Sequence, residues 1–225
     1  MQSWGTNGRF TTRPTEYFPT VSGVAGILLS ALGVERRDSR AELLNVGKLE
    51  LFVREDKRGK ILKDYQTVNI STTDKNDTKQ TYRYYLSDYI FTVGLVGDDE
   101  LLEKYRDALS SPKEALFLGR KSFVPSVPVL HGIFEYESPE RFLTDHPLQL
   151  ENSRALHFSE LMFSELKRSV VKTDPSGNHI VMDVPVDFSS DNRQYLGRVV
   201  SYGTVSVTNP FHRKTHDPME MVNDQ

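Results

Sequence analysis

Residues 62–86 constrain the fold of this chain more than any other segment, because a stretch without apolar side chains separates two predicted strands. The two arms, residues 62–70 and 81–86, are polar, and the centre, residues 71–80, contains no apolar residue. Such a centre has nothing to bury in a core. We therefore predict a protruding β-hairpin whose tip is solvated or ordered only by a partner.

The predicted elements around this hairpin favour an α+β fold with a largely antiparallel sheet. The clearest helix covers residues 20–33, with Ser22 as the expected N-cap and Gly33 as the expected stop. Residues 89–96 are apolar nearly throughout, which predicts a strand buried on both faces, and a helix follows to Leu109. Further strands are predicted at residues 48–55, 166–173, 179–184 and 199–207, and a short helix at 38–46.

Composition excludes several classes of function. The 225-residue chain contains no cysteine, which rules out thiol nucleophiles, cysteine-ligated zinc and disulfides. Lys and Arg number 28 against 31 Asp and Glu, a net charge of −3, so any nucleic-acid site must draw on a local cluster of positive charge. The longest apolar stretch, residues 24–32, is too short for a membrane span, and the first residues do not resemble a signal peptide. These features predict a soluble cytoplasmic protein without a membrane partner.

The sequence offers little for catalysis, since it has no P-loop and no serine-hydrolase motif. His212 and His216 have the i, i+4 spacing of a metal pair, but prolines flank them and no Glu stands between them, which favours a solvated tail. His131 and His157 lie among apolar residues, where a structural histidine is the common case. We therefore predict no catalytic residue, no metal and no cofactor.

Basic and aromatic residues are interleaved in two segments. Arg9 and Arg13 share a loop with Trp4 and Tyr17, and guanidinium groups beside exposed aromatic rings hold single-stranded RNA by phosphate pairing and base stacking. Residues 48–83 hold nine Lys or Arg against six Asp or Glu, with tyrosines between them. A solvated face with ordinary core aromatics is the alternative, and these residues alone leave both interpretations open.

A string of motifs resembles one known family. The motifs are Met1-Gln-Ser-Trp-Gly5, Arg13-Pro-Thr15, Phe18-Pro-Thr-Val-Ser-Gly-Val-Ala-Gly-Ile-Leu-Leu-Ser-Ala-Leu-Gly33, Asp64-Tyr-Gln-Thr-Val68, Thr81-Tyr-Arg-Tyr-Tyr-Leu-Ser-Asp88 leading into Phe91-Thr-Val93, Leu118-Gly-Arg-Lys-Ser122, and Asp183-Val-Pro-Val-Asp-Phe188 with Tyr195 and Arg198. In this order, from residue 1 to about residue 207, they resemble the CasD family of the RAMP superfamily. CasD is the subunit of the type I-E CRISPR Cascade complex that holds the 5′ handle, the repeat-derived segment at the 5′ end of the CRISPR RNA.

The resemblance implies a ferredoxin-like, RRM-type antiparallel sheet over residues 1–145, with helices on one face and a thumb hairpin at residues 62–86. A small C-terminal β-rich extension over residues 146–208 and a flexible tail over residues 209–225 would follow. Members of the family usually carry an apolar strand just ahead of the block at residues 1–5, where this chain begins. We therefore expect that first strand to be missing and its neighbours to have unpaired backbone groups.

The resemblance also implies a function, that of a non-catalytic RNA-binding subunit in antiviral defence. The expected partners are the CRISPR RNA handle, the CasC-like backbone subunit and the CasA-like large subunit. The candidate RNA-binding residues are Trp4, Arg9, Arg13, Tyr17, Ser22, Tyr65, Thr67, Arg83, Arg120 and Lys121. The alternative is a metal-independent endoribonuclease that processes CRISPR RNA, as one relative in another subtype does. Such an enzyme needs a base such as histidine near the scissile phosphate, and no histidine precedes His131.

Overall fold

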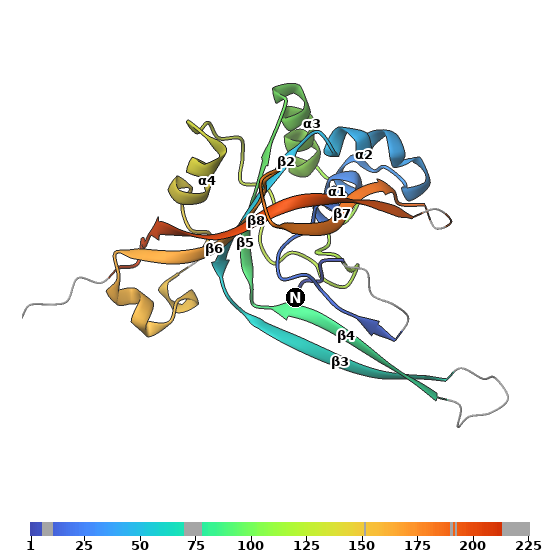
Figure 1. Cartoon of the computed structure of the whole chain (residues 1–225), viewed down its shortest axis with the longest axis horizontal. Coiled ribbons are helices and arrows are strands. Elements are labelled where there is room, and N and C mark those ends of the chain that lie inside the picture. Colours follow the sequence, from blue (N-terminus) through green and yellow to red (C-terminus); the bar gives the residue numbers. More distant parts are fainter. Residues whose placement is uncertain (6–10, 70–77, 151, 190, 192, 213–225) are drawn as a thin grey trace, which may run out of the picture.

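The computed structural model describes residues 1–5, 11–69, 78–150, 152–189, 191 and 193–212. Arg9, residues 71–77 of the expected hairpin tip and the chain beyond residue 212 lie outside the described residues. Within them the fold is α+β, with one five-stranded antiparallel sheet, one three-stranded sheet and four α-helices (Figure 1). The predicted fold class is confirmed.

The five-stranded sheet joins strands from both halves of the chain. Its strands are β2 (Glu50–Lys57), β5 (Ile90–Val96), β6 (Glu165–Thr173), β7 (His179–Asp187) and β8 (Gln194–Thr208), in the order β5-β2-β6-β8-β7. Strand β6 pairs with β2 from Phe52↔Lys172 to Arg54↔Val170. The C-terminal β-rich extension therefore extends this sheet, and residues 146–208 are not a separate β unit. The turn after β6 leads to β7, but β8 lies between these two strands.

Strand β5 is covered on both faces, as expected, but it lies at the edge of the sheet. Among the described strands it pairs only with β2, and most of its residues are half-buried. Phe91, Val93 and Leu95 pack against the main core, while a Cβ at Gly94 would collide with the Phe142 ring on the opposite face. Both faces are thus covered, which explains the apolar sequence, but no described strand shields the outer edge.

Three helices pack on one face of this sheet, as expected: α1 (Val21–Leu32), α2 (Arg40–Val46) and α3 (Asp99–Ser110). Thr20, not Ser22, is the N-cap of α1, because its hydroxyl accepts a hydrogen bond from the Gly23 N–H while Ser22 already lies in the first turn. Gly33, with φ of 70°, ends the helix as predicted. The main core contains Val24, Leu28, Leu29, Leu43, Val46, Leu51, Val53, Tyr105, Val171 and Val200.

A fourth helix, α4 (Pro139–Asp145), covers part of the opposite face, where Leu143 packs against Phe52 and Val170. This element was not predicted. Arg54, which is fully buried, fixes it there by donating to the carbonyls of Leu143, His146 and Pro147 while it pairs with Asp56. Three short 3-10 helices complete the described elements: η1 (Arg36–Asp38), η2 (Ser153–Ala155) and η3 (Phe158–Met162).

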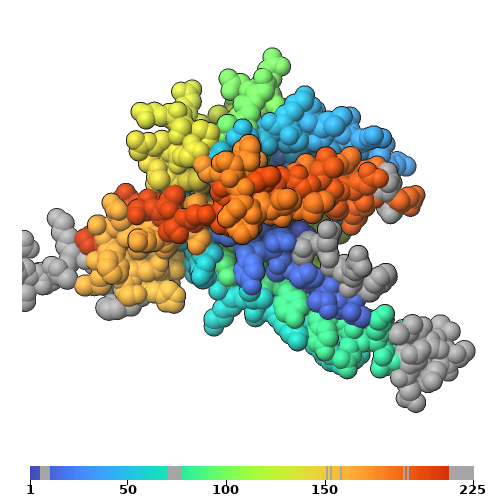
Figure 2. Space-filling model, viewed as in Figure 1, coloured from blue at the N-terminus to red at the C-terminus, as the bar shows by residue number. Residues whose placement is uncertain are grey.

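The predicted hairpin is present and projects from the body of the molecule (Figures 1 and 2). Strands β3 (Lys60–Asn69) and β4 (Thr78–Ser87) pair antiparallel from Lys60↔Ser87 to Asn69↔Thr78, and β1 (Thr12–Arg13) lies parallel to β4. We call residues 60–69 and 78–87 the thumb. Its root is tight, because a Cβ at Gly59 would collide with the Ser87 carbonyl oxygen.

The chain after β8 is anchored for several residues. Asn209 is buried, and its side-chain amide donates to the carbonyls of Glu160 and Phe163. The expectation of a flexible tail from residue 209 is therefore wrong for its first residues. The longest described helices have 12 residues, and no described helix has the length and apolar character to cross a membrane.

Candidate nucleic-acid interface

The register of the thumb sorts the candidate residues onto two faces. Arg83 lies between Asp64 on β3 and Arg13 on β1, so these three side chains share one face. Tyr65 pairs with Tyr82, and the alternation of the strands places both on the other face. We call these the guanidinium face (Arg13, Arg83, Tyr85 and Arg120) and the tyrosine face (Lys63, Tyr65, Thr67 and Tyr82).

On the guanidinium face, Arg83 lacks a complete set of partners. Its Nε is buried and has no hydrogen-bond acceptor among the described residues. Asp64, although opposite, accepts from the Tyr85 hydroxyl and from Gln66 instead. A buried unpaired donor costs about 1–3 kcal/mol, and like charges in register oppose each other. An anion between Arg13 and Arg83 would relieve both costs, so this geometry suits a phosphate.

The loop that contains the Leu118–Ser122 motif adds Arg120 to this face. Its guanidinium carbon lies 4.9 Å from the centroid of the Tyr85 ring, and Tyr85 packs edge-on against Phe123. Gly119 has a φ of 88°, and a Cβ there would collide with the Ser3 carbonyl oxygen, so the loop lies directly on the N-terminal segment. Lys121, next to it, is exposed. The loop therefore holds Arg120 two residues along β4 from Arg83.

The tyrosine face presents aromatic rings instead of guanidinium groups. The Tyr65 and Tyr82 ring centroids are 5.5 Å apart, and Lys63 Nζ lies 4.3 Å from the Tyr82 centroid. Tyr65 is 52% exposed, and Thr67 is exposed further toward the tip. Exposed tyrosines with a neighbouring cation can stack on unpaired bases. The structure thus separates Tyr65 and Thr67 from the arginines.

One candidate is not available to RNA as expected. Trp4 is 3% exposed and packs against Ile27, Leu86 and Tyr89, so its ring cannot stack on a base. It supports the N-terminal segment, and its Nε1–H donates to the side-chain oxygen of Gln2. Ser22 belongs to the start of α1, with its hydroxyl 3.2 Å from that of Thr20.

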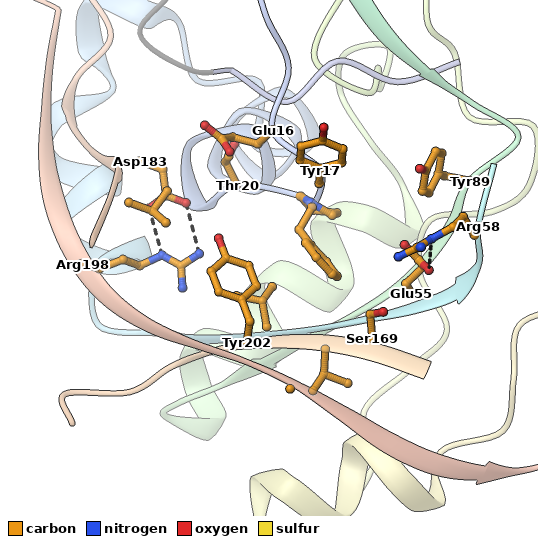
Figure 3. Close-up of a pocket in the computed structure, with 16 residues that line it drawn as sticks. Glu16, Tyr17, Thr20, Glu55, Arg58, Tyr89, Ser169, Asp183, Arg198 and Tyr202 are labelled. Atoms are coloured by element: carbon orange, nitrogen blue, oxygen red, sulfur yellow. Dashed lines mark hydrogen bonds and ion pairs between the residues drawn. The ribbon is translucent and has the colours of Figure 1, made fainter. Parts of the chain in front are cut away.

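Tyr17, 61% exposed, borders a pocket of about 460 Å³ at the thumb root (Figure 3). The pocket lies between the segment Glu16–Thr20, the residues where the thumb leaves the sheet, and strands β6 to β8. Arg58, Tyr89 and Tyr202 also line it. Sequence reasoning missed Arg58 and Tyr202, because nothing in the local pattern distinguishes them from other polar residues of a loop and a strand.

Two residues of the sequence motifs, Asp183 and Arg198, form an ion pair that lines the pocket. Asp183, 1% exposed, pairs with Arg198 at 2.9 Å and accepts the backbone N–H of Val21. A carboxylate at the first residue of α1 interacts favourably with the helix dipole. Arg198 also donates to Thr173. These residues therefore tie α1 to the sheet, which gives their motif a structural role.

The described histidines do not belong to the guanidinium face or to the pocket lining, although His179 packs behind Tyr202. His146 is buried, its ring contacts Tyr136 and Gln149, and burial together with the nearby Arg54 lowers its pKa. No group of three or more metal-binding side chains occurs in the part of the chain that the structure describes.

The fold and this surface define a class: α+β proteins with a projecting hairpin that carries arginines on one face. A family model described as CRISPR-associated protein (Cas_Cas5) matches residues 1–201. The chain therefore belongs to the Cas5 family of CRISPR-associated proteins, which confirms the family resemblance.

Relatives and solved structures agree with this assignment. The chain is 31% identical over 162 residues to "CRISPR system Cascade subunit CasD" of Escherichia coli (strain K12), a match that covers 65% of this chain and 72% of that protein. A structure described as "CRISPR RNA-guided surveillance complex" matches with a TM-score of 0.73 and 24% identity, over 98% of this chain and 92% of that chain. Another, "Crystal structure of Cas protein", gives 0.60 and 28%, over 95% and 93%.

Proposed function

We propose that this protein is a non-catalytic CRISPR RNA-binding subunit of a type I-E Cascade surveillance complex, where it captures the 5′ handle. The observation that carries the proposal is the guanidinium face, on which Arg13 and Arg83 lie in register and the Arg83 Nε is buried without an acceptor. RNA phosphates supply the missing acceptors through charge-assisted hydrogen bonds. Family membership and the CasD relative support the same conclusion.

The two thumb faces bind different parts of the RNA. Phosphates pair with the arginines on one face, while unstacked bases pack on Tyr65 and Tyr82 of the other. The overall charge of −3 gives no general attraction for RNA, so binding depends on this local cluster. Capture of the handle anchors the 5′ end of the guide and links the CasC-like backbone to the CasA-like large subunit.

The test is co-purification of the chain with the other Cascade proteins and a CRISPR RNA, with or without its 5′ handle. We expect handle-dependent incorporation that Arg83→Ala weakens. Arg37→Ala is the matched control, because Arg37 is exposed on η1 and its ion pairs within the described residues are with its sequence neighbours Glu35 and Asp38. Incorporation that does not depend on the handle would contradict the proposal.

Catalysis is tested by sizing the RNA after incubation with the isolated chain. We expect intact RNA, because no described histidine lies near the guanidinium face. Cleavage of repeat RNA that survives removal of divalent metal would instead establish the metal-independent endoribonuclease, and the non-catalytic assignment would fail.

A further inference from the structure

The pocket at the thumb root carries an uncompensated negative charge. Of its charged lining residues, Asp183 pairs with Arg198, and Glu55 pairs with Arg58 at 3.1 Å. Glu16 has no side-chain partner among the described residues. The pocket therefore repels a phosphate, unlike the guanidinium face, and favours a neutral group that offers N–H donors.

Aromatic side chains form much of the remaining lining. Tyr202 projects from β8 toward the segment that carries Tyr17 and Thr20, and its ring packs against Phe18 and His179 (Figure 3). Burial and the nearby Glu16 carboxylate raise the pKa of the Tyr202 phenol, so its hydroxyl remains a donor at neutral pH. A volume of about 460 Å³ lined by aromatic rings and by charged and polar side chains has room for a planar heterocycle with hydrogen-bonding groups on its edge.

We propose that this pocket binds one unstacked nucleobase with an exocyclic amino group, extruded from the RNA that the guanidinium face holds. The inference rests on the proposed function, since the same RNA supplies both phosphate and base. Glu16 accepts the amino N–H, and Tyr17 and Tyr202 stack or pack on the ring. Uracil flanks its one N–H with two carbonyls, which a carboxylate repels, so we expect adenine, cytosine or guanine to be preferred.

The chain geometry allows one short stretch of RNA to reach both sites. Arg13 on the thumb and Tyr17 at the pocket are four residues apart, which spans at most about 14 Å. Arg58 and Tyr89 line the pocket from the point where the thumb leaves the sheet. A nucleotide whose phosphate pairs with Arg13 therefore has a neighbour within reach of the pocket.

The experiment is a competition for incorporation into the complete Cascade complex. CRISPR RNAs with a single abasic site at each handle position compete against the unmodified RNA, with wild-type protein and with Tyr17→Ala. Among the positions that respond to base removal, we expect one whose roughly 10-fold loss of incorporation with wild type depends on Tyr17. With Tyr17→Ala the penalty at that position falls below about 2-fold. Because Tyr17 is 61% exposed, this variant leaves the core intact.

Two further variants make the test specific. Phe163→Ala, on a similarly exposed aromatic residue outside the pocket and outside the thumb, keeps the penalty at that position. Glu16→Gln reduces the preference for an amino-bearing base over uracil at that position. The pocket inference is overturned if every abasic penalty is the same in wild type and Tyr17→Ala while incorporation still depends on the handle. If an RNA without a handle competes equally, the proposed function itself fails.

Discussion

Arg54 in the five-stranded sheet and Arg83 in the thumb are both arginines with buried polar atoms, yet their surroundings are opposite. Arg54 is fully buried and donates to Asp56 and to three carbonyls around α4. Arg83 has a buried Nε without an acceptor and stands beside Arg13. Arg54 finds its hydrogen-bond partners within the chain, whereas Arg83 leaves a donor without an acceptor among the described residues. Arg168 on β6 also has a buried Nε without a described partner, but its Nη1 pairs with Glu160 at 2.9 Å. We therefore expect Arg54 to act in folding and Arg83 in binding.

The largest expected effect concerns Arg54, whose polar atoms are hydrogen-bonded within the chain. Arg54→Ala leaves Asp56 buried without its cation and removes the donors for three carbonyls. We expect a loss of about 3–5 kcal/mol in the free energy of unfolding, measured by denaturant titration. Arg141→Ala is the control, because its ion pairs with Glu137 and Asp145 are solvent-exposed on both sides, and it should cost less than about 1 kcal/mol. Equal losses would contradict the contrast.

On the thumb, substitution of an arginine is expected to weaken assembly and to leave folding intact. Arg13→Ala or Arg120→Ala should lower handle-dependent assembly about 10-fold or more, because hydrogen bonds to charged groups contribute about 1.5–3 kcal/mol. Neither change should abolish folding, since Arg13 is exposed and Arg120 contacts Tyr85 from a loop. Denaturant titration alongside the assembly assay separates the two effects. Normal assembly by both single variants and the double variant would remove the site assignment.

The dependence of assembly on salt sharpens the same assignment with a smaller effect. Each phosphate that an arginine neutralises contributes about −0.7 to the slope of log affinity against log salt for a single strand. Arg83→Ala should therefore make the slope shallower by about 0.7. Tyr65→Ala on the tyrosine face should weaken binding without changing the slope. An unchanged slope for Arg83→Ala would show that this arginine does not meet a phosphate.

Sequence reasoning succeeded where the pattern is local. The absence of apolar residues at 71–80 predicts the hairpin, and Gly33 predicts the end of α1. It failed where distant segments decide: the apolar run of β5 does not reveal that this strand lies at a sheet edge, and α4 is held by Arg54 from β2. The burial of Trp4 belongs to this second group, because Ile27, Leu86 and Tyr89 come together only in the fold.

The candidate site follows the same division. Arg13 and Arg83 can be chosen from composition and motif, but their pairing depends on β1 lying beside β4, which no local pattern of a two-residue strand predicts. The separation of Tyr65 from the arginines follows from strand alternation once the register is known. The pocket combines six separate parts of the chain, so Tyr202 and Arg58 could not be identified from their neighbours in sequence.

The smallest expected effect concerns the carboxylate of Asp174, which directly follows β6 of the five-stranded sheet. Asp174 accepts hydrogen bonds from Ser176 and Ser201, which lower its pKa to about 2. Because the folded value lies below the ordinary value near 3.9, its stabilising contribution is present above about pH 4 and disappears as the pH falls through about 2. A carbon-detected NMR titration of Asp174 should show this midpoint, and Ser201→Ala should raise it. A midpoint near 3.9 in the wild-type chain would mean that the hydrogen bonds from Ser176 and Ser201 do not stabilise the charged form of Asp174.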